Sequence, residues 1–543
     1  MAKENKKFYI TSSIAYTNAA PHIGFALEVL QADVLARHHR LKGEDVFFLT
    51  GTDEHGSKIF RKAKEAGKDP QEFVDEIAEK FRALRNVLNL SNDDFIRTSD
   101  QKRHWPTVRK IWQKLKDNGD IYKKKYQGLY CVGCEAFLKE KDLVDGKCPN
   151  HQKEPETIEE ENYFFKLSKY QDKLKDILEN NNIKVVPEAR KNEMLSFVSE
   201  GLEDVSCSRE KSKLGWGVPV ADDEKQVVYV WFEALINYLS ALDYAGNGER
   251  FKKYWPADVH CIGKDITRFH LLLWPAMLLS LGLPLPKTVF VHGYITSGGK
   301  KMSKSLGNVV DPFELVKRYG SARASTELSR MPSPQVGTDA VRYFLLREIS
   351  PTEDGDFTQQ KFEERYNGDL ANGIGNLLSR ALTLAEKKWD GVVPQIDINK
   401  TGRALLFPNK PKNVGNYDFR RGLFTIDQGC YDFFKNFEFN RILSYFNLIV
   451  QRCDTYIEDY KLYKLNDLFG KQGENLYDIL EGIRHFAVRV IPFLPQTADK
   501  IFEQLGLDPE KEKKKPLEEA KKWGGLKQGT KIKKGAPLFP RLE

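Results

Sequence analysis

Apolar positions near the start of the chain alternate between the spacing of strands and the spacing of a helix. Lys7–Ile14 is a short apolar run typical of a strand, and Ala26–Leu41 places its large apolar residues on one side of a helix. Asp45–Thr50 is almost wholly apolar, as expected of a strand that is covered on both faces. Strand, helix and strand in this order predict a βαβ unit and therefore a parallel sheet.

The same alternation returns later, after an interruption. Residues 57–118 are predicted to be mostly helical, whereas residues 119–165 are rich in glycine, lysine and cysteine and contain only short strand-like pieces. Apolar runs typical of strands return further on, at Val227–Phe232, Val259–Ile262 and Val289–Ile295. A helical run at 267–281 separates the last two. We interpret this as a second βα series, so that one nucleotide-binding sheet is split by an insertion.

Helical spacing dominates from residue 361 onward, most clearly in Tyr366–Lys388 and Glu438–Tyr460. Ser321–Gly337 and Asn399–Asn416 have the composition of surface loops, and the charged run Glu510–Lys515 is read as a solvated turn. The predicted fold class is therefore α/β, with a split Rossmann-like parallel sheet and an insertion, followed by an α-helical bundle.

Composition narrows the class of protein. The 543 residues, 41% hydrophobic and 30% charged, are typical of a globular chain. A net charge of 85 − 77 = +8 permits a polyanion as partner. The uncharged stretch Leu271–Pro286 is too short and too rich in proline to cross a bilayer, so no membrane association is expected. The start MAKENKK lacks the apolar core of a secretory signal, and seven cysteines, an odd number, favour a reducing cytoplasm.

Three cysteines and a histidine carry the most specific metal signal. They follow the pattern Cys131-x2-Cys134-x13-Cys148-x2-His151, with glycine and proline between them. Two close pairs of such ligands can converge as a tetrahedron, for which Zn²⁺ is the natural occupant. Four protein ligands leave no open position, so the site is read as structural. The alternative is that the cysteines are unrelated and the histidine is accidental.

Two further motifs are suited to phosphate chemistry. Pro21–Gly24 joins the first strand to its helix, where His22 and the helix amides can face a phosphate. Lys300–Asn308 (KKMSKSLGN) is a basic loop after the last strand, suited to neutralising charge on a transferring phosphate. Taken singly, the first is also compatible with an ordinary strand-to-helix turn and the second with a solvated basic loop.

Together, these two motifs resemble the HIGH and KMSKS signatures of class I aminoacyl-tRNA synthetases, at His22–Phe25 and Lys301–Ser305. The resemblance covers nearly the whole chain and narrows to the methionyl-tRNA synthetase family through ITSSIAYTNAAPHIG, FFLTGTDEHG, the four metal ligands, VYVWFEALINYLSAL, HCIGKDITRFHLLLWPAM, VHGYIT and APLFPRLE. The chain departs from the family pattern at Phe25, where a second histidine is usual, and at Tyr463, where tryptophan is usual. Ser321–Gly337 and Asn399–Asn416 are read as insertions.

The resemblance implies an enzyme that attaches L-methionine to tRNA(Met), the initiator tRNA included. Methionine and ATP, which carries Mg²⁺, form methionyl-adenylate and pyrophosphate, and the methionyl group then passes to the tRNA with release of AMP. By family match the catalytic residues are His22, Lys301 and Lys304. The same match implies ATP binding by these three together with Gly24, Gly263 and Asp265.

The family match also implies a methionine pocket, in which Asp53 pairs with the substrate ammonium. The other lining residues implied are Ser13, Ile14, Tyr16, Trp231, Ala234, Leu235, Tyr238, Phe269 and His270. Judged from the sequence without the resemblance, the aromatic residues among them are compatible with an ordinary core, and His270 with a satisfied core histidine. Asn376, Arg380 and Tyr463 are implied to read the anticodon, the tyrosine as a stacking platform.

The implied division is a first half of the catalytic domain at 1–118, a connective insertion with the zinc site at 119–215, the second half at 216–297, the KMSKS loop and linking region at 298–360, and a helical anticodon-binding domain at 361–543. No appended dimerisation module follows, so a monomer is expected. The competing interpretations are a class I synthetase for cysteine, valine or leucine, a non-catalytic paralogue that binds RNA, and a nucleotidyltransferase that acts on a small molecule.

Overall fold

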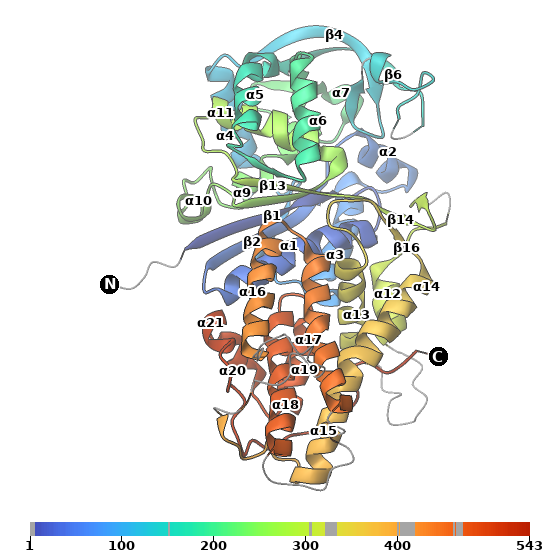
Figure 1. The fold of residues 1–543 in the computed structure, drawn as a ribbon. Coiled ribbons are helices and arrows are strands. Elements are labelled where there is room, and N and C mark those ends of the chain that lie inside the picture. The colour runs from blue at the N-terminus through green and yellow to red at the C-terminus, as the bar shows by residue number, and fades with distance from the viewer. Residues whose placement is uncertain are drawn as a thin grey trace.

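A six-stranded parallel sheet crosses the middle of the molecule (Figure 1). The computed structural model describes residues 6–542 except 139, 150–151, 303–306, 321–333, 399–400, 402–418, 460–461 and 463–470. The strands, in spatial order, are β3 (Asp94–Arg97), β2 (Asp45–Asp53), β1 (Lys7–Tyr16), β12 (Val259–Gly263), β13 (Thr288–His292) and β7 (Lys184–Val186). Each neighbouring pair is parallel, so the carboxyl ends of all six strands meet at one edge of the sheet.

Successive strand residues enter two different cores. Phe8 and Ile10 of β1 belong to the apolar cluster on one face, whereas Tyr9 between them belongs to the cluster on the other face. Phe48 and Phe47 of β2 divide in the same way. Because side chains alternate across a strand, a continuous apolar run fills both cores, which explains the composition of Asp45–Thr50. The predicted parallel sheet is confirmed.

Helices cover both faces of the sheet. On the face of Phe8 and Ile10 lie α1 (Ile23–Leu41), α3 (Pro70–Val87) and α13 (Pro334–Arg347). On the face of Tyr9 lie α4 (Trp105–Asp117), α5 (Gln171–Glu179), α6 (Glu188–Ser199), α8 (Val230–Ala234), α9 (Asn237–Ser240) and α11 (Trp274–Ser280), the last preceded by a π-helical turn at Phe269–Leu273. Two peripheral helices, α2 (Ser57–Glu65) and α10 (Glu249–Tyr254), complete this half.

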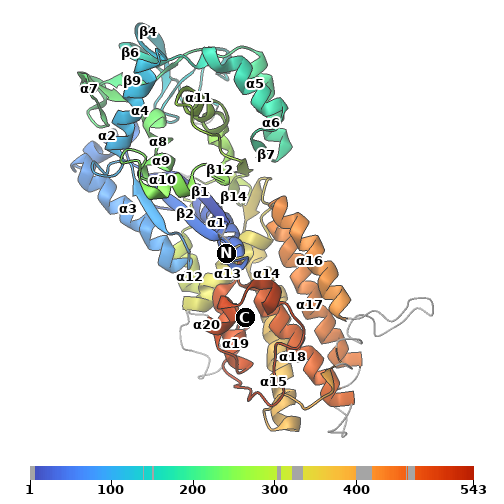
Figure 2. The ribbon, with the colours of Figure 1, turned by 90° about the vertical axis from the view of Figure 1, so that its left-hand side faces the viewer.

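The segment between the sheet halves forms a layer of its own at the top of the molecule in Figures 1 and 2. It contains a four-stranded antiparallel sheet of β5 (Ala136–Leu138), β4 (Ile121–Cys131), β6 (Glu156–Phe165) and β8 (Val205–Ser206). A second small sheet contains β10 (Pro219–Val220), β11 (Asp223–Val228) and β9 (Ser208–Glu210), beside α7 (Lys211–Leu214). Glu135 in this layer contacts Tyr16 at the carboxyl end of β1 and Ser57 and Lys58 shortly after the end of β2.

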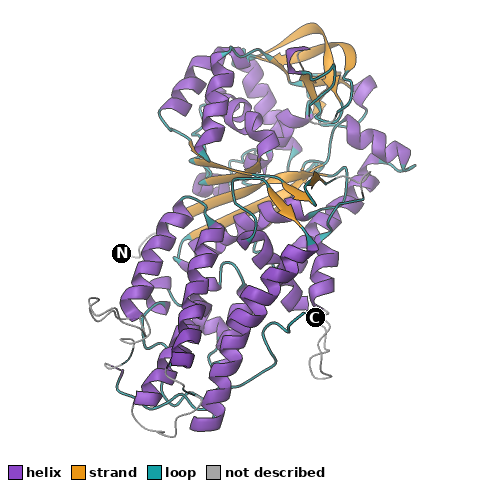
Figure 3. Cartoon of the chain, turned by 45° about the vertical axis from the view of Figure 1, so that its right-hand side comes forward, coloured by secondary structure: helices purple, strands orange, loops and turns teal. Residues whose placement is uncertain are grey.

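The opposite end is almost entirely helical, as Figure 3 shows. Its elements are α12 (Pro312–Gly320), α14 (Gln359–Arg365), a π-helical segment Tyr366–Gly375, α15 (Asn376–Trp389), α16 (Phe419–Lys435), α17 (Phe439–Asp459), α18 (Lys471–Val490), α19 (Pro495–Gln504), α20 (Pro509–Lys514) and α21 (Leu517–Ala520). A small sheet of β15 (Lys300–Lys301), β14 (Ile295–Ser297) and β16 (Gly355–Phe357) joins this end to the main sheet. The predicted helical C-terminal region is confirmed. No helix in the described ranges is long and apolar enough to cross a membrane.

Several element predictions were wrong or incomplete. Val227–Phe232 is not one strand, because β11 ends at Val228 in a peripheral sheet and α8 begins at Val230. The buried side chains of both pieces produce the same apolar run in the sequence. The edge strands β3 and β7 were not predicted, since each is short and borders a helical stretch.

Of the three predicted loops, one is a helix, one is helical in part, and one lies almost wholly outside the described residues. Glu510–Lys515 is not a turn: Asp508 caps the short helix α20 through the amides of Glu510 and Lys511, and Glu512 is buried. Of Ser321–Gly337, the last four residues open α13 instead of forming a loop. The preceding part of that segment, and Asn399–Asn416 apart from Thr401, lie outside the described residues.

Candidate active site at the carboxyl edge of the sheet

His22 caps the helix that follows the first strand. Its Nδ1 accepts a hydrogen bond from the Gly24 amide at 3.0 Å, and burial lowers the pKa of the imidazole. The ring is therefore neutral near pH 7 and carries its proton on Nε2, which makes Nε2–H a donor. A Cβ at Gly24 would come within 2.8 Å of the ring, so only glycine permits this geometry. The arrangement offers a neutral donor at the N-terminus of α1, a favourable place for phosphate.

The basic loop reaches the same place from the far end of the sequence. Met302 Cε lies 3.8 Å from the position that a Cβ of Gly24 would take, which brings the two signature motifs into contact. Lys301 is exposed on β15, with its ammonium 5.6 Å from the centre of the Tyr294 ring. Lys304 lies outside the described residues. The loop therefore meets the start of the helix that His22 caps through Met302, the residue next to Lys301.

Gly263 and Asp265 follow the adjacent strand β12. Asp265 is exposed as a residue, but partial burial of its carboxyl group raises the pKa of that group. A Cβ at Gly263 would lie 2.8 Å from its Oδ1. Behind Gly263 a buried ion pair joins Glu28 Oε2 of α1 to His292 Nε2 of β13 at 2.8 Å. Although burial opposes the charge, the Glu28 carboxylate raises the pKa of His292. The carboxylate at Asp265 therefore stands at the crevice outside the strand ends, where open α/β sheets bind nucleotides.

Asp53 is a buried carboxylate that lacks a full set of partners. It ends β2, and its Oδ1 has no hydrogen-bond partner among the described residues. Burial first, and then the nearby Glu233 carboxylate, raise the pKa of Asp53. A buried acid beside other acids is unfavourable unless a cation neutralises it. The site is therefore suited to a cationic group brought by a ligand.

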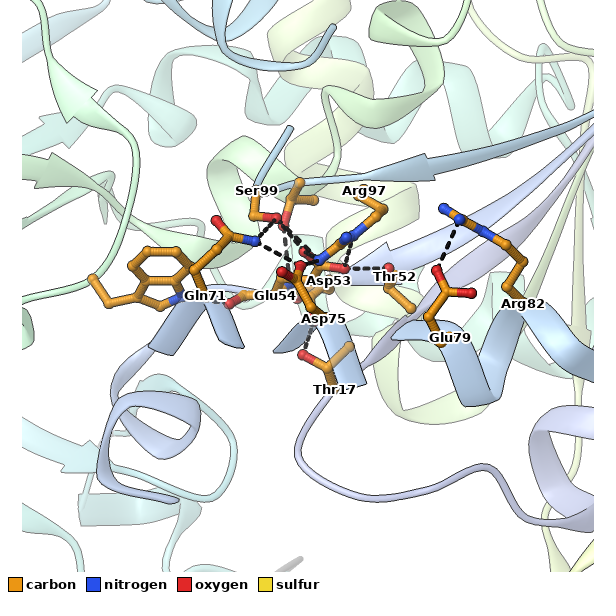
Figure 4. A network of polar contacts seen from close by, with 12 residues as sticks. Thr17, Thr52, Asp53, Glu54, Gln71, Asp75, Glu79, Arg82, Arg97 and Ser99 are labelled. Carbon is orange, nitrogen blue, oxygen red and sulfur yellow. Dashed lines mark hydrogen bonds and ion pairs between the residues drawn. The ribbon is translucent and has the colours of Figure 1, made fainter. Parts of the chain in front are cut away.

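A polar network fixes the backbone on both sides of Asp53, as Figure 4 shows. The Asp53 carbonyl accepts from the Thr17 amide at 3.0 Å. The next residue, Glu54, is fully buried and accepts from Arg97 Nε at 2.7 Å and Nη2 at 2.9 Å. Arg97 also pairs with Asp75 on α3. These bonds fix the chain around Asp53, whose Oδ1 remains without a partner among the described residues.

The aromatic residues of the implied methionine pocket are arranged around the end of β1. Trp231 and Phe269 stack with ring centres 4.1 Å apart and an angle of 9° between the planes. Both rings are half-buried, as are Ser13, Ile14 and Tyr16, whereas Ala234, Leu235 and Tyr238 are buried. Ser13 donates from its amide and its hydroxyl to Glu28 Oε1, at 2.7 and 2.6 Å. The exposed edges of the rings are thus those that a ligand can reach.

His270 is a fully satisfied histidine. Its Nδ1 bonds to the Ile266 carbonyl at 3.1 Å and its Nε2 to the Tyr238 hydroxyl at 2.8 Å. Burial lowers the pKa of His270 to about 4, so the ring is neutral, with Nδ1–H donating and Nε2 accepting. Through these two hydrogen bonds, His270 fixes the Tyr238 hydroxyl and the π-helical turn that carries Phe269.

The predicted metal ligands converge as far as they are described. The sulfur atoms of Cys131, Cys134 and Cys148 all lie within 4.8 Å of one another, and the Cys134 amide points at Cys131 Sγ at 3.4 Å. An amide directed at a cysteine sulfur stabilises a thiolate, which is the form that binds metal. His151 lies outside the described residues. Three convergent cysteine sulfur atoms therefore fit a structural metal ion.

The residues implied to read an anticodon lie on α15 or outside the described residues. Asn376 is exposed at the start of α15. Arg380, one turn later, pairs with Asp454 at 3.1 Å and also with Glu458, both on α17. Burial, opposed by Arg380, raises the pKa of Asp454 to about 6. Tyr463 is not described. The guanidinium is thus held against two acids that an incoming base edge would have to replace.

Four buried acids near the site were missed by sequence reasoning: Glu28, Glu54, Glu135 and Glu233. Glu233 binds His55 and His104 at 2.7 Å each, and although burial opposes it, these histidines lower the pKa of Glu233. The available signal was a charged residue within an apolar run, as in Leu27–Leu30 and Val230–Ala234. A carboxylate in such a position needs partners.

Comparison with known proteins is consistent with this geometry. A family model described as "tRNA synthetases class I (M)" matches residues 8–156 and 151–382. A methionine–tRNA ligase of Caldanaerobacter subterraneus is 44% identical over 99% of this chain and 79% of the relative, and one of Thermotoga maritima is 42% identical over 99% and 80%. The solved Mycobacterium tuberculosis methionyl-tRNA synthetase in complex with methionyl-adenylate has a TM-score of 0.87 and 36% identity, with 99% of this chain and 100% of that chain covered.

Proposed function

Because the chain belongs to the methionyl-tRNA synthetase family of class I aminoacyl-tRNA synthetases, we propose that the edge of its sheet is the site at which methionine is activated. The enzyme attaches L-methionine to tRNA in an ATP-dependent reaction that passes through methionyl-adenylate and releases pyrophosphate and AMP. The observation that carries the site assignment is the buried carboxylate of Asp53, whose Oδ1 has no hydrogen-bond partner among the described residues. It lies near Glu233 of α8, the helix that also carries Trp231 of the aromatic stack.

The two ends of methionine fit the two parts of this pocket. Its ammonium supplies the cation that Asp53 lacks, and the resulting pair relieves the burial that raises the pKa of the carboxylate. Its thioether is apolar and polarizable and packs well against aromatic rings such as those of Trp231 and Phe269. Ser13, Ile14, Tyr16, Ala234, Leu235, Tyr238 and His270 complete the proposed pocket.

ATP occupies the adjoining part of the edge in this proposal. His22 Nε2–H donates to a phosphate, Gly24 permits its close approach, and Lys301 and Lys304 neutralise its charge. Gly263 and Asp265 take the adenosine, with Asp265 accepting from ribose hydroxyls. An oxygen of the methionine carboxylate attacks the α-phosphorus, and the bond to the departing pyrophosphate breaks. This displacement needs positioning and neutralisation of charge and forms no covalent bond to the enzyme. Mg²⁺ arrives with ATP.

We assign the cysteine cluster to one structural Zn²⁺ per chain, held by Cys131, Cys134, Cys148 and His151. Four protein ligands fill a tetrahedron, so the ion has no position for substrate and supplies folding energy to a loop that has little core of its own. Metal analysis of the purified protein tests this assignment. One zinc per chain is expected, and another metal or none would contradict it.

The helical end provides the tRNA-binding part of the proposal. Asn376, Arg380 and Tyr463 are proposed to contact the CAU anticodon of tRNA(Met), including the initiator. The division at residues 118, 215, 297 and 360 is proposed to separate the two catalytic halves, the insertion, the linking region and this helical domain. We further propose that the chain acts as a monomer in the cytoplasm.

The experiment that tests the activity is ATP–pyrophosphate exchange with each amino acid in turn. Exchange is expected with L-methionine and close to background with cysteine, valine and leucine, which separates this chain from the other class I enzymes. Exchange with a different amino acid would overturn the substrate assignment. Exchange with none would favour an RNA-binding paralogue or a nucleotidyltransferase.

A further inference from the structure

We propose that Glu135, the residue next to the metal-binding Cys134, is a positioning residue that sets the shape of the methionine pocket. The inference rests on the pocket proposed above. Glu135 lies in the turn between β4 and β5, in the left-handed backbone region at φ +50°, and only 3% of its surface is exposed. Non-glycine residues rarely adopt this conformation, so the turn is held in place by what the side chain contacts.

The Glu135 carboxylate binds groups from three separate elements. Its Oε1 accepts from the Tyr16 hydroxyl of β1 at 3.0 Å and from the Lys58 amide of α2 at 2.6 Å. Its Oε2 accepts from the Ser57 hydroxyl at 2.7 Å and from the Tyr130 hydroxyl of β4. We call the segment Cys131–Cys148, which carries the cysteine cluster, the metal loop. One side chain of this loop thereby joins the insertion to β1, the strand that lines the pocket.

These contacts also complete the helix that follows Asp53 in the chain. α2 has Gly56 at its N-cap, with φ +108° and no side-chain cap of its own. Glu135 takes the place of that cap, because it accepts from an amide of the first turn and puts a negative charge at the positive end of the helix. A Cβ at Gly56 would come within 2.9 Å of Glu135 Oε1 and 2.8 Å of the Tyr16 hydroxyl. Glycine is therefore required for this close approach.

The backbone of the same loop is tied to the other side of the pocket. Trp231 Nε1 donates to the Cys134 carbonyl at 3.2 Å, and the Tyr229 hydroxyl donates to the Glu135 carbonyl. Trp231 in turn stacks on Phe269. Metal ligand, Glu135 and pocket aromatics thus form one contiguous set of contacts, so folding of the metal loop and binding of methionine are thermodynamically linked.

The Glu156–Arg61 ion pair offers a matched control for the contacts of Glu135. Glu156 of β6 also joins the insertion to α2, through Arg61 at 2.9 and 3.0 Å, but both side chains are about half exposed and touch no pocket residue in these contacts. Exposed ion pairs contribute little. If the insertion merely needs attachment to α2, Glu135→Ala and Glu156→Ala should behave alike. If Glu135 positions the pocket, only its loss should weaken methionine binding.

The experiment measures dissociation constants for methionine and for ATP, together with zinc content, on the full-length chain. For Glu135→Ala we expect the dissociation constant of methionine to rise roughly tenfold or more and that of ATP to stay within about twofold of the wild-type value. The zinc content should be unchanged. Glu156→Ala should match the wild type in all three. Unchanged methionine affinity in Glu135→Ala, or equal weakening for methionine and ATP, would overturn the proposal.

A second variant keeps the test decisive if Glu135→Ala loses zinc. Tyr16→Phe leaves the metal loop untouched and removes only the hydroxyl that Glu135 holds, so it should also weaken methionine binding, and the double variant should be no weaker than Glu135→Ala. Wild-type methionine affinity in Tyr16→Phe, or losses of affinity that add in the double variant, would refute the role proposed for Glu135.

Trp231→Ala separates the proposal on Glu135 from the proposed methionine pocket. If Trp231→Ala leaves methionine affinity unchanged, the assignment of the pocket is wrong, whatever the effect of Glu135→Ala.

Discussion

The central sheet contacts the helical end of the molecule on one side and the insertion on the other, and the two sets of contacts differ. Towards the helical end, one apolar cluster runs without a break from α1 through α13 to α17, α18 and α19. Towards the insertion a second apolar cluster also crosses the junction, for example through Phe165 and Phe232. In addition, the turn that carries the cysteines reaches the active site through hydrogen bonds of the Glu135 carboxylate and the Cys134 carbonyl. Apolar contact is non-directional, whereas hydrogen bonds fix positions. Apolar packing therefore stabilises both junctions, and at the second the hydrogen bonds of the cysteine turn also place side chains.

Buried ionisable groups interrupt the apolar junction, and the largest of them is an arginine. Arg342 of α13 is fully buried, and its Nη2 pairs with Asp33 of α1 at 2.8 Å. Its other nitrogens donate to the carbonyls of Phe493 at 2.7 Å and Leu88 at 2.9 Å. The helix that His22 caps is thereby joined to the helical end by one guanidinium. The comparison predicts that damage here lowers stability, while damage at the metal loop changes affinity for methionine.

The largest expected effect is that of Arg342→Met. Removing the guanidinium leaves the buried carbonyls of Leu88, Pro492 and Phe493 without this donor and the Asp33 carboxylate with Arg37 and Ser91 alone. At about 1–3 kcal/mol for each unsatisfied buried group, the expected loss is about 3–5 kcal/mol. Urea denaturation of variant and wild type measures the loss. Arg441→Met, which removes an exposed pair with Glu438, serves as control and should change stability by less than about 0.5 kcal/mol. A loss below about 1 kcal/mol for Arg342→Met would show that the apolar contacts alone hold this junction.

Asp53→Asn should act on binding instead of stability. The neutral amide cannot form a charge-assisted bond to an ammonium, a bond that contributes about 1.5–3 kcal/mol, so methionine affinity should fall roughly ten- to hundredfold. ATP affinity should stay within about twofold, as measured by equilibrium dialysis for each ligand. Asp75→Asn changes the half-exposed end of the same network and should leave both affinities unaltered. Equal effects of the two variants would mean that the network, and not the Asp53 charge, is what matters.

Arg380→Ala has the smallest expected effect of these substitutions and concerns the far end of the helical region. Loss of one base contact should lower kcat/KM for aminoacylation by about tenfold, while pyrophosphate exchange, which needs no tRNA, stays normal. Both rates are measured on the same preparation, with Arg441→Ala as control. Equal loss in both assays would indicate a folding defect, and no loss in either would remove Arg380 from tRNA recognition.

The sequence was sufficient for elements with a strong period or motif. β1, α1 and β2 were predicted from apolar spacing, and the cysteine spacing led to the cluster at Cys131, Cys134 and Cys148. The short strand β7 was missed because three residues carry no usable period, and it pairs with β13 from a distant part of the chain.

The missed parts of the site have a common physical cause. Glu135 is next to a ligand in the sequence, yet its partners Tyr16, Ser57 and Lys58 come from segments more than seventy residues away. Arg342 likewise stands in an ordinary helical pattern, and only tertiary packing brings it to Asp33. Periodicity reports which face of an element is buried, but not which distant group a buried charge will meet.

The measurement that tests the account most directly is the methionine affinity of the zinc-loaded protein against that of the same preparation after a chelator has removed the metal. ATP affinity is measured alongside, and circular dichroism shows whether the main sheet stays folded. The account predicts that methionine binding weakens by about tenfold or more on metal loss, that ATP binding changes by less than about twofold, and that zinc restores the first value. Equal weakening of both ligands, or unchanged methionine affinity in the metal-free protein, would contradict it.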